Sequence, residues 1–334
     1  MHDASRRGSA VTAATPPRSS LFRWLPFPLA AVTLAGFGGG WHWLLDLTSH
    51  FRWYWLLLAL VCLAASGRRA GRFAVACLAV AVLGNVWPLL PYWVPSASGT
   101  VTAATPAAAR PDAVSIVSIN VLTSNADKPA VLAYLRSRDP DIIVALEVDA
   151  AWAAALAGLA DRWPHTVVQP RDDNFGIALL AKQPPRERWV REFGDAGVPS
   201  IVATFTDPAA DYTVIATHPV PPKGPAYARD RDAQLRAIAE FVAASPLPCV
   251  VAGDLNATPW SAAFRDLVAR SGLRDTALGR GVQATWNARA WAPRIPIDHI
   301  LAPPGTAILR RAVGPDVGSD HFPVEAELRL PAIR

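Results

Sequence analysis

The stretch PCVVAGDLNATPW, residues 248–260, carries the pattern from which the fold of this chain can be worked out. Its apolar run Cys249–Ala252 is typical of a buried strand, and Asp254 and Asn256 follow it two positions apart. Positions i and i+2 of a strand face the same way. If the strand extends that far, we expect the carboxylate and the carboxamide to point together into one cleft.

Polar side chains recur at the ends of other apolar runs along the chain. Each has an ordinary structural explanation, since an Asn can cap a turn and a lone His is more often structural than catalytic. Six such residues at strand ends are harder to attribute to chance, because enzymes built on sheets place catalytic groups there. Besides Asp254 and Asn256, these residues are Asn120, Glu147, His218, Asp298, Asp320 and His321.

Apolar periodicity predicts further strands and helices between residues 112 and 334. The predicted strands are 115–121, 141–148, 176–182, 186–193, 200–207, 212–219, 248–255, 297–303 and 322–328. The predicted helices are 127–138, 150–160, 229–244 and 260–271. Strands and helices alternate and then several strands run together, which predicts an α/β (α+β) domain with mixed sheets covered by helices.

The positive charge of the chain is concentrated in its N-terminal third. Residues 1–111 hold nine Arg and no Lys against two Asp, a net charge of +7. The remaining residues hold 23 Lys and Arg against 25 Asp and Glu, a net charge of −2. The basic character therefore does not indicate a nucleic-acid-binding domain, and is better explained by charges that flank membrane segments.

The N-terminal third predicts a membrane anchor. Residues 1–21 are polar and basic and are expected to be disordered, whereas residues 22–94 hold apolar stretches at about 24–47, 51–66 and 73–94. A soluble helical domain and a cleaved signal peptide are the alternatives, which three apolar segments within 75 residues disfavour. Residues 95–111 form a linker rich in small residues, followed by the domain 112–334.

Arginine placement predicts the orientation of this anchor in a plasma (inner) membrane. Four arginines precede the first apolar segment, and Arg68, Arg69 and Arg72 lie between the second and third. The positive-inside rule then places the N-terminus in the cytoplasm and the domain 112–334 outside it. This holds if the short middle segment spans the bilayer, and a re-entrant segment would leave the domain in the cytoplasm.

The order and spacing of the strand-end residues resemble a known family. The motifs SIN (118–120), ALE (145–147), THP (217–219), GDLNATP (253–259), IDHI (297–300) and SDHFPV (319–324) are similar to those of the endonuclease/exonuclease/phosphatase superfamily. The resemblance covers about Val114 to Leu330, and the apolar N-terminal segments resemble those of membrane-anchored bacterial members. It implies a four-layer sandwich of two packed β-sheets flanked by helices.

The resemblance also implies a hydrolase that acts on phosphate esters by metal-assisted attack of water. Glu147, with Asn120 and Asp320, would hold Mg²⁺, for which Mn²⁺ is the alternative. Asp298 would orient His321, and either His321 or Asp254 would be the general base. Asn256 and His218 would donate hydrogen bonds to the phosphate oxygens.

Two further residues are weaker candidates. Asn174 precedes a predicted strand, where members of the family place a substrate contact, although a turn residue before Gly176 explains it equally well. Trp286 could line the pocket or fill the core, and the core is favoured here.

The substrate class stays open at this stage. A lipid headgroup or a small phosphodiester fits the anchor, the short loops and the slightly acidic domain. A nuclease that acts on DNA or RNA is the alternative, although duplex binding draws heavily on basic residues. A non-catalytic, membrane-anchored binding module on the same fold is a third hypothesis, which the complete polar set disfavours. Partners beyond the ester substrate and the lipid bilayer are not inferred.

Overall fold

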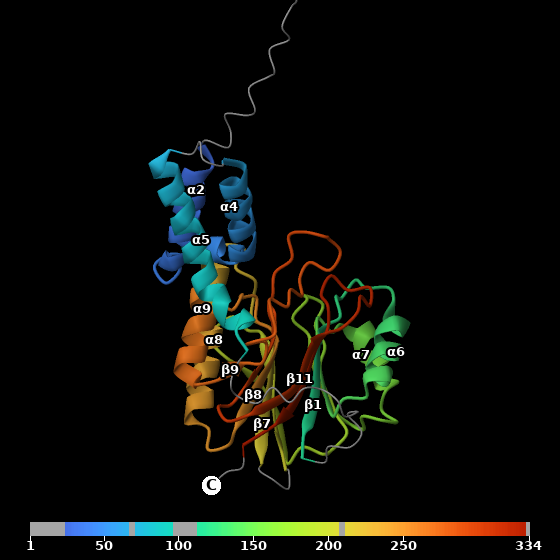
Figure 1. Cartoon of the computed structure of the whole chain (residues 1–334). Helices are drawn as coiled ribbons and strands as arrows, with labels where there is room; N and C mark the ends of the chain where they lie inside the picture. Colours follow the sequence, from blue (N-terminus) through green and yellow to red (C-terminus); the bar gives the residue numbers. More distant parts are fainter. Residues whose placement is uncertain (1–23, 67–70, 96–111, 207–210, 332–334) are drawn as a thin grey trace, which may run out of the picture.

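The protein was analysed as a computed structural model, which describes residues 24–66, 71–95, 112–206 and 211–331. The expected disordered tail 1–21 and almost all of the linker 95–111 lie outside the described residues. The described part comprises a group of N-terminal helices and a domain of two β-sheets with helices on their outer faces (Figure 1).

The first sheet contains six strands in the order β11-β12-β1-β2-β4-β3. β1 and β2 are parallel, and the other neighbours are antiparallel. The parallel pair is joined by the helix α6 (Lys128–Arg138), which Asp127 caps through its side chain. The strand bounds are β1 Val114–Asn120, β2 Ile142–Leu146, β3 His165–Gln169, β4 Ile177–Ala181, β11 Ala307–Val313 and β12 Val324–Arg329.

The second sheet repeats this plan with six strands in the order β5-β6-β7-β8-β10-β9. Here β7 and β8 are the parallel pair, and α8 (Pro225–Ala244) makes the crossover between them. The strand bounds are β5 Glu187–Glu192, β6 Pro199–Phe205, β7 Tyr212–Thr217, β8 Cys249–Asp254, β9 Arg274–Asp275 and β10 Asp298–Ala302.

Three apolar clusters hold four layers together. Residues such as Val144, Val214 and Val250 fill the space between the two sheets. A second cluster lies under α6 and α7 (Ala150–Ala157), and a third under α8 and α9 (Ala262–Ser271). Figure 1 shows the two helix pairs on opposite sides of the packed sheets. The predicted mixed-sheet sandwich flanked by helices is therefore confirmed.

Three strands were not predicted from the sequence: β3, β9 and β11. β3 and β9 each lie at one edge of a sheet, where half-exposed residues weaken the alternation of apolar and polar side chains. β11 is the other edge of the first sheet and contains Arg310 and Arg311, and its pairing with β12 is irregular between Ile308 and Arg310. Edge strands of this kind leave little periodic signal.

The N-terminal helices divide the apolar region differently from the expected segments. The stretch 24–47 is not one helix: α2 covers Pro26–Ala35, a 3₁₀ turn follows at Gly36–Gly38, and α3 covers Trp43–Ser49. The five residues 36–40 include four glycines, whose backbone freedom disfavours a continuous helix. α4 (Arg52–Ser66) and α5 (Arg72–Trp93) correspond to the second and third segments.

One described helix, α5, is long and apolar enough to cross a membrane by itself. α3 and α4 meet that criterion only when they are counted as one segment, and they are bent by 61° where they join. α2 with its 3₁₀ turn, Pro26–Gly38, is apolar but shorter. Three membrane crossings therefore stay a prediction.

Candidate active site

A single pocket collects the strand-end residues. It has a volume of about 540 Å³ and lies at the ends of β2, β7 and β8, beside the start of β10. Of the residues predicted to be functional, the pocket is lined by Glu147, Asn174, His218, Asp254, Asn256, Asp320 and His321. Asn120 and Asp298 lie behind these residues and contact them directly.

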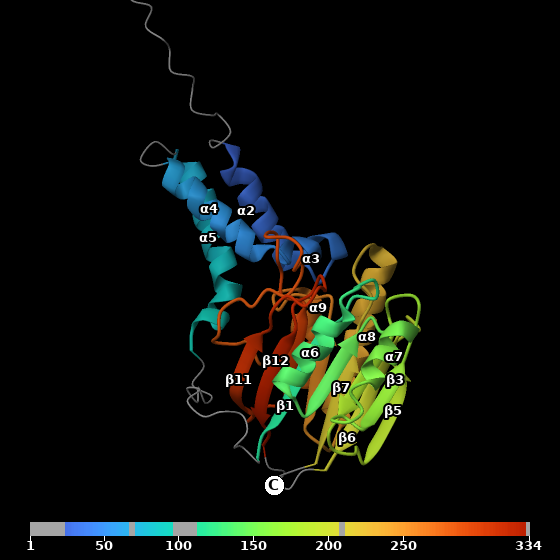
Figure 2. The same cartoon turned by 90° about the vertical axis from the view of Figure 1, so that its right-hand side faces the viewer.

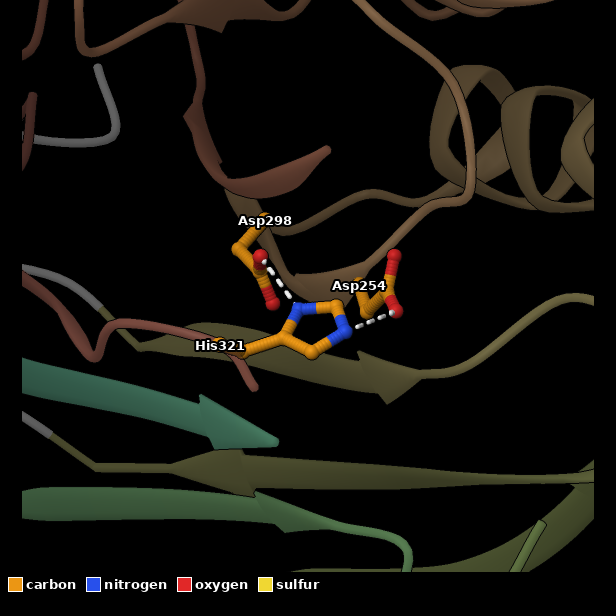
Figure 3. A group of neighbouring side chains, drawn as sticks. All are labelled: Asp254, Asp298 and His321. Atoms are coloured by element: carbon orange, nitrogen blue, oxygen red, sulfur yellow. Dashed lines mark hydrogen bonds and ion pairs between the residues drawn. The ribbon is translucent and has the colours of Figure 1, made fainter. Parts of the chain in front are cut away.

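His321 lies between two buried carboxylates (Figure 3). Its Nδ1 is 2.8 Å from Asp298 Oδ2, and its Nε2 is 3.7 Å from Asp254 Oδ2. Asp298 and Asp254 are directly paired across β10 and β8, so one stretch of sheet presents both groups. His321 comes from the loop before β12 in the other sheet, where Ser319 Oγ donates to the carbonyl of Asn120. The constellation thus joins the two sheets.

Neighbouring charges shift the pKa values of His321 and Asp254. Burial acts to lower the pKa of His321, but the charges of Asp298 and Asp254 outweigh it and raise the pKa to about 10. Burial acts to raise the pKa of Asp254, but the charges of His321 and His218 lower it on balance. In the metal-free site at neutral pH, His321 is therefore protonated and Asp254 is a carboxylate.

His218 and Asn256 complete the wall around Asp254. His218 Nε2 is 3.5 Å from Asp254 Oδ2, and the buried Nδ1 has no hydrogen-bond partner among the described residues. Burial acts to lower the pKa of His218, and the hydrogen bond to Asp254 and its charge raise it overall. Asn256 Nδ2 donates to the carbonyl of Pro219 over 2.9 Å, which fixes the orientation of its side chain.

Asn256 does not reach the pocket in the way that strand alternation predicted. β8 ends at Asp254, and Asn256 adopts a left-handed conformation with φ of 48°. Its backbone N–H donates to Asp254 Oδ1 over 2.9 Å, as in a tight Asx turn. Both residues line the pocket, as expected, but they do so because the chain turns there and not because the strand extends through Asn256.

Glu147 is held in place from two sides. It follows β2 in a left-handed conformation with φ of 62°, which is uncommon for a residue other than glycine and is found at functional sites. Asn120 Nδ2 donates to Oε1 over 2.9 Å, and the backbone N–H of Thr123 donates to Oε2 over 3.3 Å. Asn120 Oδ1 accepts from the backbone N–H of Leu122, so Asn120 is placed to orient Glu147.

Asp320 and Trp286 meet on another side of the pocket. Trp286 Nε1 donates to Asp320 Oδ2 over 3.2 Å, whereas the buried Oδ1 has no hydrogen-bond partner among the described residues. The sequence favoured a place in the core for Trp286. The structure corrects this, because the indole is half-buried and lines the pocket.

Asn174 lies at the rim. Its side chain is exposed, and its left-handed backbone (φ 67°) fits the alternative of a turn before β4 as well as a substrate contact. The neighbouring Phe175 packs its ring against His218, with centroids 5.4 Å apart. Phe175 therefore contacts the site more closely than Asn174 does.

The donor set suits a hard divalent cation such as Mg²⁺. Glu147 and Asp320 offer carboxylate oxygens to the pocket, and the buried Asp320 Oδ1 lacks a partner that a cation would supply. Asp254, Asp298 and His321 also lie close enough together to hold an ion. In that group, however, Asp298 Oδ2 and His321 Nδ1 are already paired with each other. Both groups are therefore candidates for a cation site, and the unpartnered Asp320 Oδ1 favours Glu147 with Asp320.

Several residues in the pocket or in contact with its lining gave no sequence signal. Thr123 contacts Glu147 from a loop of ordinary composition. Leu47, His50 and Phe51 also line the pocket, although they belong to the apolar N-terminal region. From the sequence, that region was predicted to be a membrane anchor alone. No local pattern distinguishes an apolar residue that lines a pocket from one that faces lipid.

Solved structures share the fold of this domain. The chain superposes on humanized D. rerio TDP2 with a TM-score of 0.55 and 19% identity, covering 65% of this chain and 99% of the other. An endonuclease/exonuclease/phosphatase from Beutenbergia cavernae gives 0.54 and 24%, covering 66% and 72%. Sphingomyelinase C from Streptomyces griseocarneus gives 0.52 and 19%, covering 67% and 99%. At these identities the likeness establishes the fold.

Sequence comparison assigns the family. No curated protein matches the chain in sequence. The model of the endonuclease/exonuclease/phosphatase family matches residues 117–321, which is more than half of the chain and includes every strand-end residue described above. This chain therefore belongs to the endonuclease/exonuclease/phosphatase family.

Proposed function

We propose that this protein is a membrane-anchored, divalent-metal-dependent phosphoesterase that hydrolyses phosphodiester or phosphomonoester bonds. One observation carries the proposal: His321, which the buried Asp298 holds by its Nδ1, and the buried Asp254 line the same pocket as the Glu147 carboxylate. A cation-binding carboxylate, a proton acceptor and a charged donor around one cavity are what ester hydrolysis at an anionic centre requires.

Glu147 and Asp320 are assigned to hold the cation, with Asn120 orienting Glu147. When bound there, Mg²⁺ or Mn²⁺ supplies positive charge that polarises a phosphoryl oxygen. Asn120 gives its amide hydrogen to Oε1 and its amide oxygen to a backbone N–H, so it is assigned a positioning role.

Asp254 is assigned as the general base. Its pKa is lowered, so it is a carboxylate at neutral pH and can accept a proton from an attacking water. The water oxygen forms the new bond to phosphorus, its proton moves to Asp254, and the ester P–O bond breaks. The departing alcohol takes up a proton from the imidazolium of His321 or from solvent.

His321, His218 and Asn256 are assigned to the phosphate. Asp298 occupies His321 Nδ1, so the charged Nε2–H is left to face Asp254 and the substrate. Asn256 Nδ2 donates one hydrogen bond to the carbonyl of Pro219, and its second amide hydrogen is assigned to a non-bridging phosphate oxygen. Donors in these fixed positions favour the more highly charged transition state.

The pocket favours a small or lipid-linked ester over duplex nucleic acid. Among the described residues that line it, Lys223 is the one lysine or arginine, against four carboxylates. Duplex recognition depends on many phosphate contacts to basic side chains. The charge of the pocket is thus matched to a single phosphate and a cation.

The first test uses the full chain in nonionic detergent micelles. Bis(4-nitrophenyl) phosphate, 4-nitrophenyl phosphate and a single-stranded oligonucleotide are each assayed with Mg²⁺, with Mn²⁺ and with chelator. We expect metal-dependent turnover of a nitrophenyl ester that His321→Ala abolishes. Turnover in chelator would contradict the metal requirement, and preference for the oligonucleotide would support a nuclease. Metal binding without any turnover would support a non-catalytic binding module.

The anchor is proposed to place the domain outside the cytoplasm, at the plasma (inner) membrane. The distribution of arginines around the apolar segments supports this orientation. A phosphatase reporter that works only after export, fused behind Arg334, should be active. An inactive but stable fusion, with activity of a cytoplasmic reporter at the same position, would reverse the orientation.

A further inference from the structure

One wall of the active-site pocket comes from the N-terminal helices. Leu47 in α3, and His50 and Phe51 in the turn to α4, line the same cavity as Glu147 and His321. We call residues 47–51 the elbow, because α3 and α4 meet there at 61°. In Figure 2, α3 lies between α2 and the sheet domain. The pocket is therefore shared between the two parts of the chain.

The pocket is lined by polar residues, which we call its polar side, and by apolar residues. The polar side comprises the carboxylates and histidines that are assigned to the phosphate and the cation, together with His50 of the elbow. Leu47 and Phe51 on the elbow are half-buried and line the cavity together with Pro221, Pro222 and Tyr227, which precede or begin α8. A phosphate ester with an apolar substituent matches this division, because burial of each methylene is favourable.

The elbow is fixed to the sheet domain by buried polar contacts. The guanidinium of Arg231 in α8 donates to Asp46 Oδ2 over 3.0 Å, and the backbone N–H of Ala262 donates to Oδ1 over 2.6 Å. Asp46 and Arg231 are only 2% and 1% exposed. Tyr54 in α4 also bonds the backbone of Arg294 in the sheet domain. These contacts on both sides of the elbow hold it in a fixed position against the sheet domain, so it forms part of the pocket wall.

The pocket lies close to the level at which the proposed membrane helices begin. α4 starts at the elbow, and Figures 1 and 2 show it rising away from the sheet domain beside α2 and α5. Trp41, just before α3, is 90% exposed, and Trp291, in the loop that Tyr54 contacts, is 91% exposed. Exposed tryptophans on both parts of the chain are typical of a bilayer surface.

We infer that the elbow is a specificity wall that holds the apolar part of a lipid phosphoester while its phosphate is hydrolysed. This inference rests on the proposed phosphoesterase function. The wall selects for the apolar group and the polar side acts on the phosphate. The helical region is then part of the active site as well as an anchor.

The test measures how activity depends on the apolar group alone. The substrates are 4-nitrophenyl phosphodiesters whose second ester group is methyl, hexyl or dodecyl, assayed with the full chain in nonionic micelles, with Mg²⁺ and with Mn²⁺. Each methylene that the wall buries is worth about fourfold in kcat/KM. We expect kcat/KM for the hexyl ester to exceed that for the methyl ester by at least about tenfold.

Variants separate the wall from simple partition into micelles. Phe51→Ala and Leu47→Ala should each reduce the hexyl-to-methyl ratio of kcat/KM by about threefold or more. Leu60→Ala is the matched control, because Leu60 is a 43% exposed residue of α4 that does not line the pocket. It should leave the ratio unchanged. Melting temperatures show whether each variant is folded, and Leu47→Ala keeps the test decisive if Phe51→Ala is not.

The outcomes distinguish the inference from the function on which it rests. If no ester is hydrolysed by the wild type with either metal, the proposed function fails and the inference fails with it. If the methyl ester is hydrolysed but the ratio is near one, or is unchanged in both folded wall variants, only the inference is overturned. A dinucleotide preferred over a dioctanoyl phospholipid in the same micelles would also overturn it.

Discussion

At the scale of single residues, the site depends on how buried charges are paired. His321 is 4% exposed, and Asp254 and Asp298 are each 2% exposed, so none of them is hydrated in the usual way. Each is tolerated because it faces an opposite charge at 2.8–3.7 Å. Removing one member leaves the others without compensation, which makes their roles testable by substitution.

Substitution of His321 should remove activity without removing the fold. His321→Ala takes away the charged donor at Nε2, and we expect kcat to fall by about 10²–10⁴-fold. Asp298→Asn keeps the size of the side chain but weakens the orientation of the imidazole, so its loss should be smaller. Steady-state kinetics with a nitrophenyl ester, beside circular dichroism, check both. Equal activity in His321→Ala and wild type would remove it from the mechanism.

Glu147 and Asn120 should differ in their effect on metal binding. Asn120→Ala removes a residue that orients a ligand, for which about a 10–100-fold loss of metal affinity is typical. Glu147→Gln removes the ligand charge itself and should cost more. Calorimetric Mn²⁺ titration measures both, and Glu192→Gln on the exposed strand β5 is the control. The reverse order of effects would contradict the assigned ligand set.

The raised pKa of His321 should make part of the stability of the metal-free protein depend on pH. The folded protein has a pKa of about 10 for this group, above the ordinary 6.5 of the unfolded chain. Its contribution to the free energy of unfolding is therefore full below pH 6.5 and is lost as the pH rises toward 10. With chelator present, the difference in Tm between wild type and His321→Gln should narrow across that window. A difference that widens would contradict the assignment.

At the scale of elements, the two parallel strand pairs determine where the candidate site residues lie. β1 with β2, and β7 with β8, bring the ends of four strands to one side of the sandwich. Asn120, Glu147, His218 and Asp254 are the last residues of these strands or follow them directly. β10 runs antiparallel to β8, so Asp298 is its first residue and lies opposite Asp254.

The close approach of β7 and β8 depends on the absence of a side chain at Gly253. Gly253 has φ of 154°, and a Cβ atom there would lie 1.9 Å from the carbonyl oxygen of Thr217. Gly253→Ala should push the strands apart and displace Asp254 from His218. We expect a loss of about 1–3 kcal/mol in unfolding free energy together with a strong loss of activity. Thermal unfolding and kinetics check this.

Gly224→Ala is the matched control for the Gly253 prediction. The backbone of Gly224 is extended, with φ of 174°, and a Cβ atom there would meet nothing within 4 Å. Its melting temperature and activity should stay at the wild-type level. Similar losses in the two variants would argue against a specific contact between β7 and β8.

At the scale of the whole molecule, the N-terminal helices and the sheet domain form one structure. Besides the elbow, the end of α5 contacts the domain, where the N–H groups of Gly279 and Gly281 donate to the carbonyls of Pro91 and Tyr92. Tyr92 Oη lies 3.1 Å from Asp275 Oδ2 in the neighbouring core. The N-terminal helices are therefore docked on the sheet domain at two places.

The contact between Asp46 and Arg231 should contribute strongly to this docking. Asp46→Asn leaves a buried guanidinium with less compensation, and removing one partner of a buried pair costs about 3–5 kcal/mol. We expect a lower melting temperature by tryptophan fluorescence in micelles. Asp266→Asn is the control, because its partners Arg236 and Arg270 are exposed and such pairs contribute about 0–1 kcal/mol each. Equal effects would show that the buried pair has no special role.

The sequence by itself determined most strands and helices of the sheet domain and indicated most candidate site residues of this protein. Apolar runs must be buried, and a polar residue at the end of such a run stands out, so Glu147, His218 and Asp254 could be recognised from local pattern. Only the tertiary structure decided how these ends meet, because strand register and sheet packing arise between distant segments. Asn256 lines the pocket because the chain turns after the end of β8, and Trp286 lines the pocket although a place in the core was expected. The tertiary structure also placed Leu47 and Phe51 against the site, because a contact between residues so far apart in the chain leaves no trace in the residues around either one.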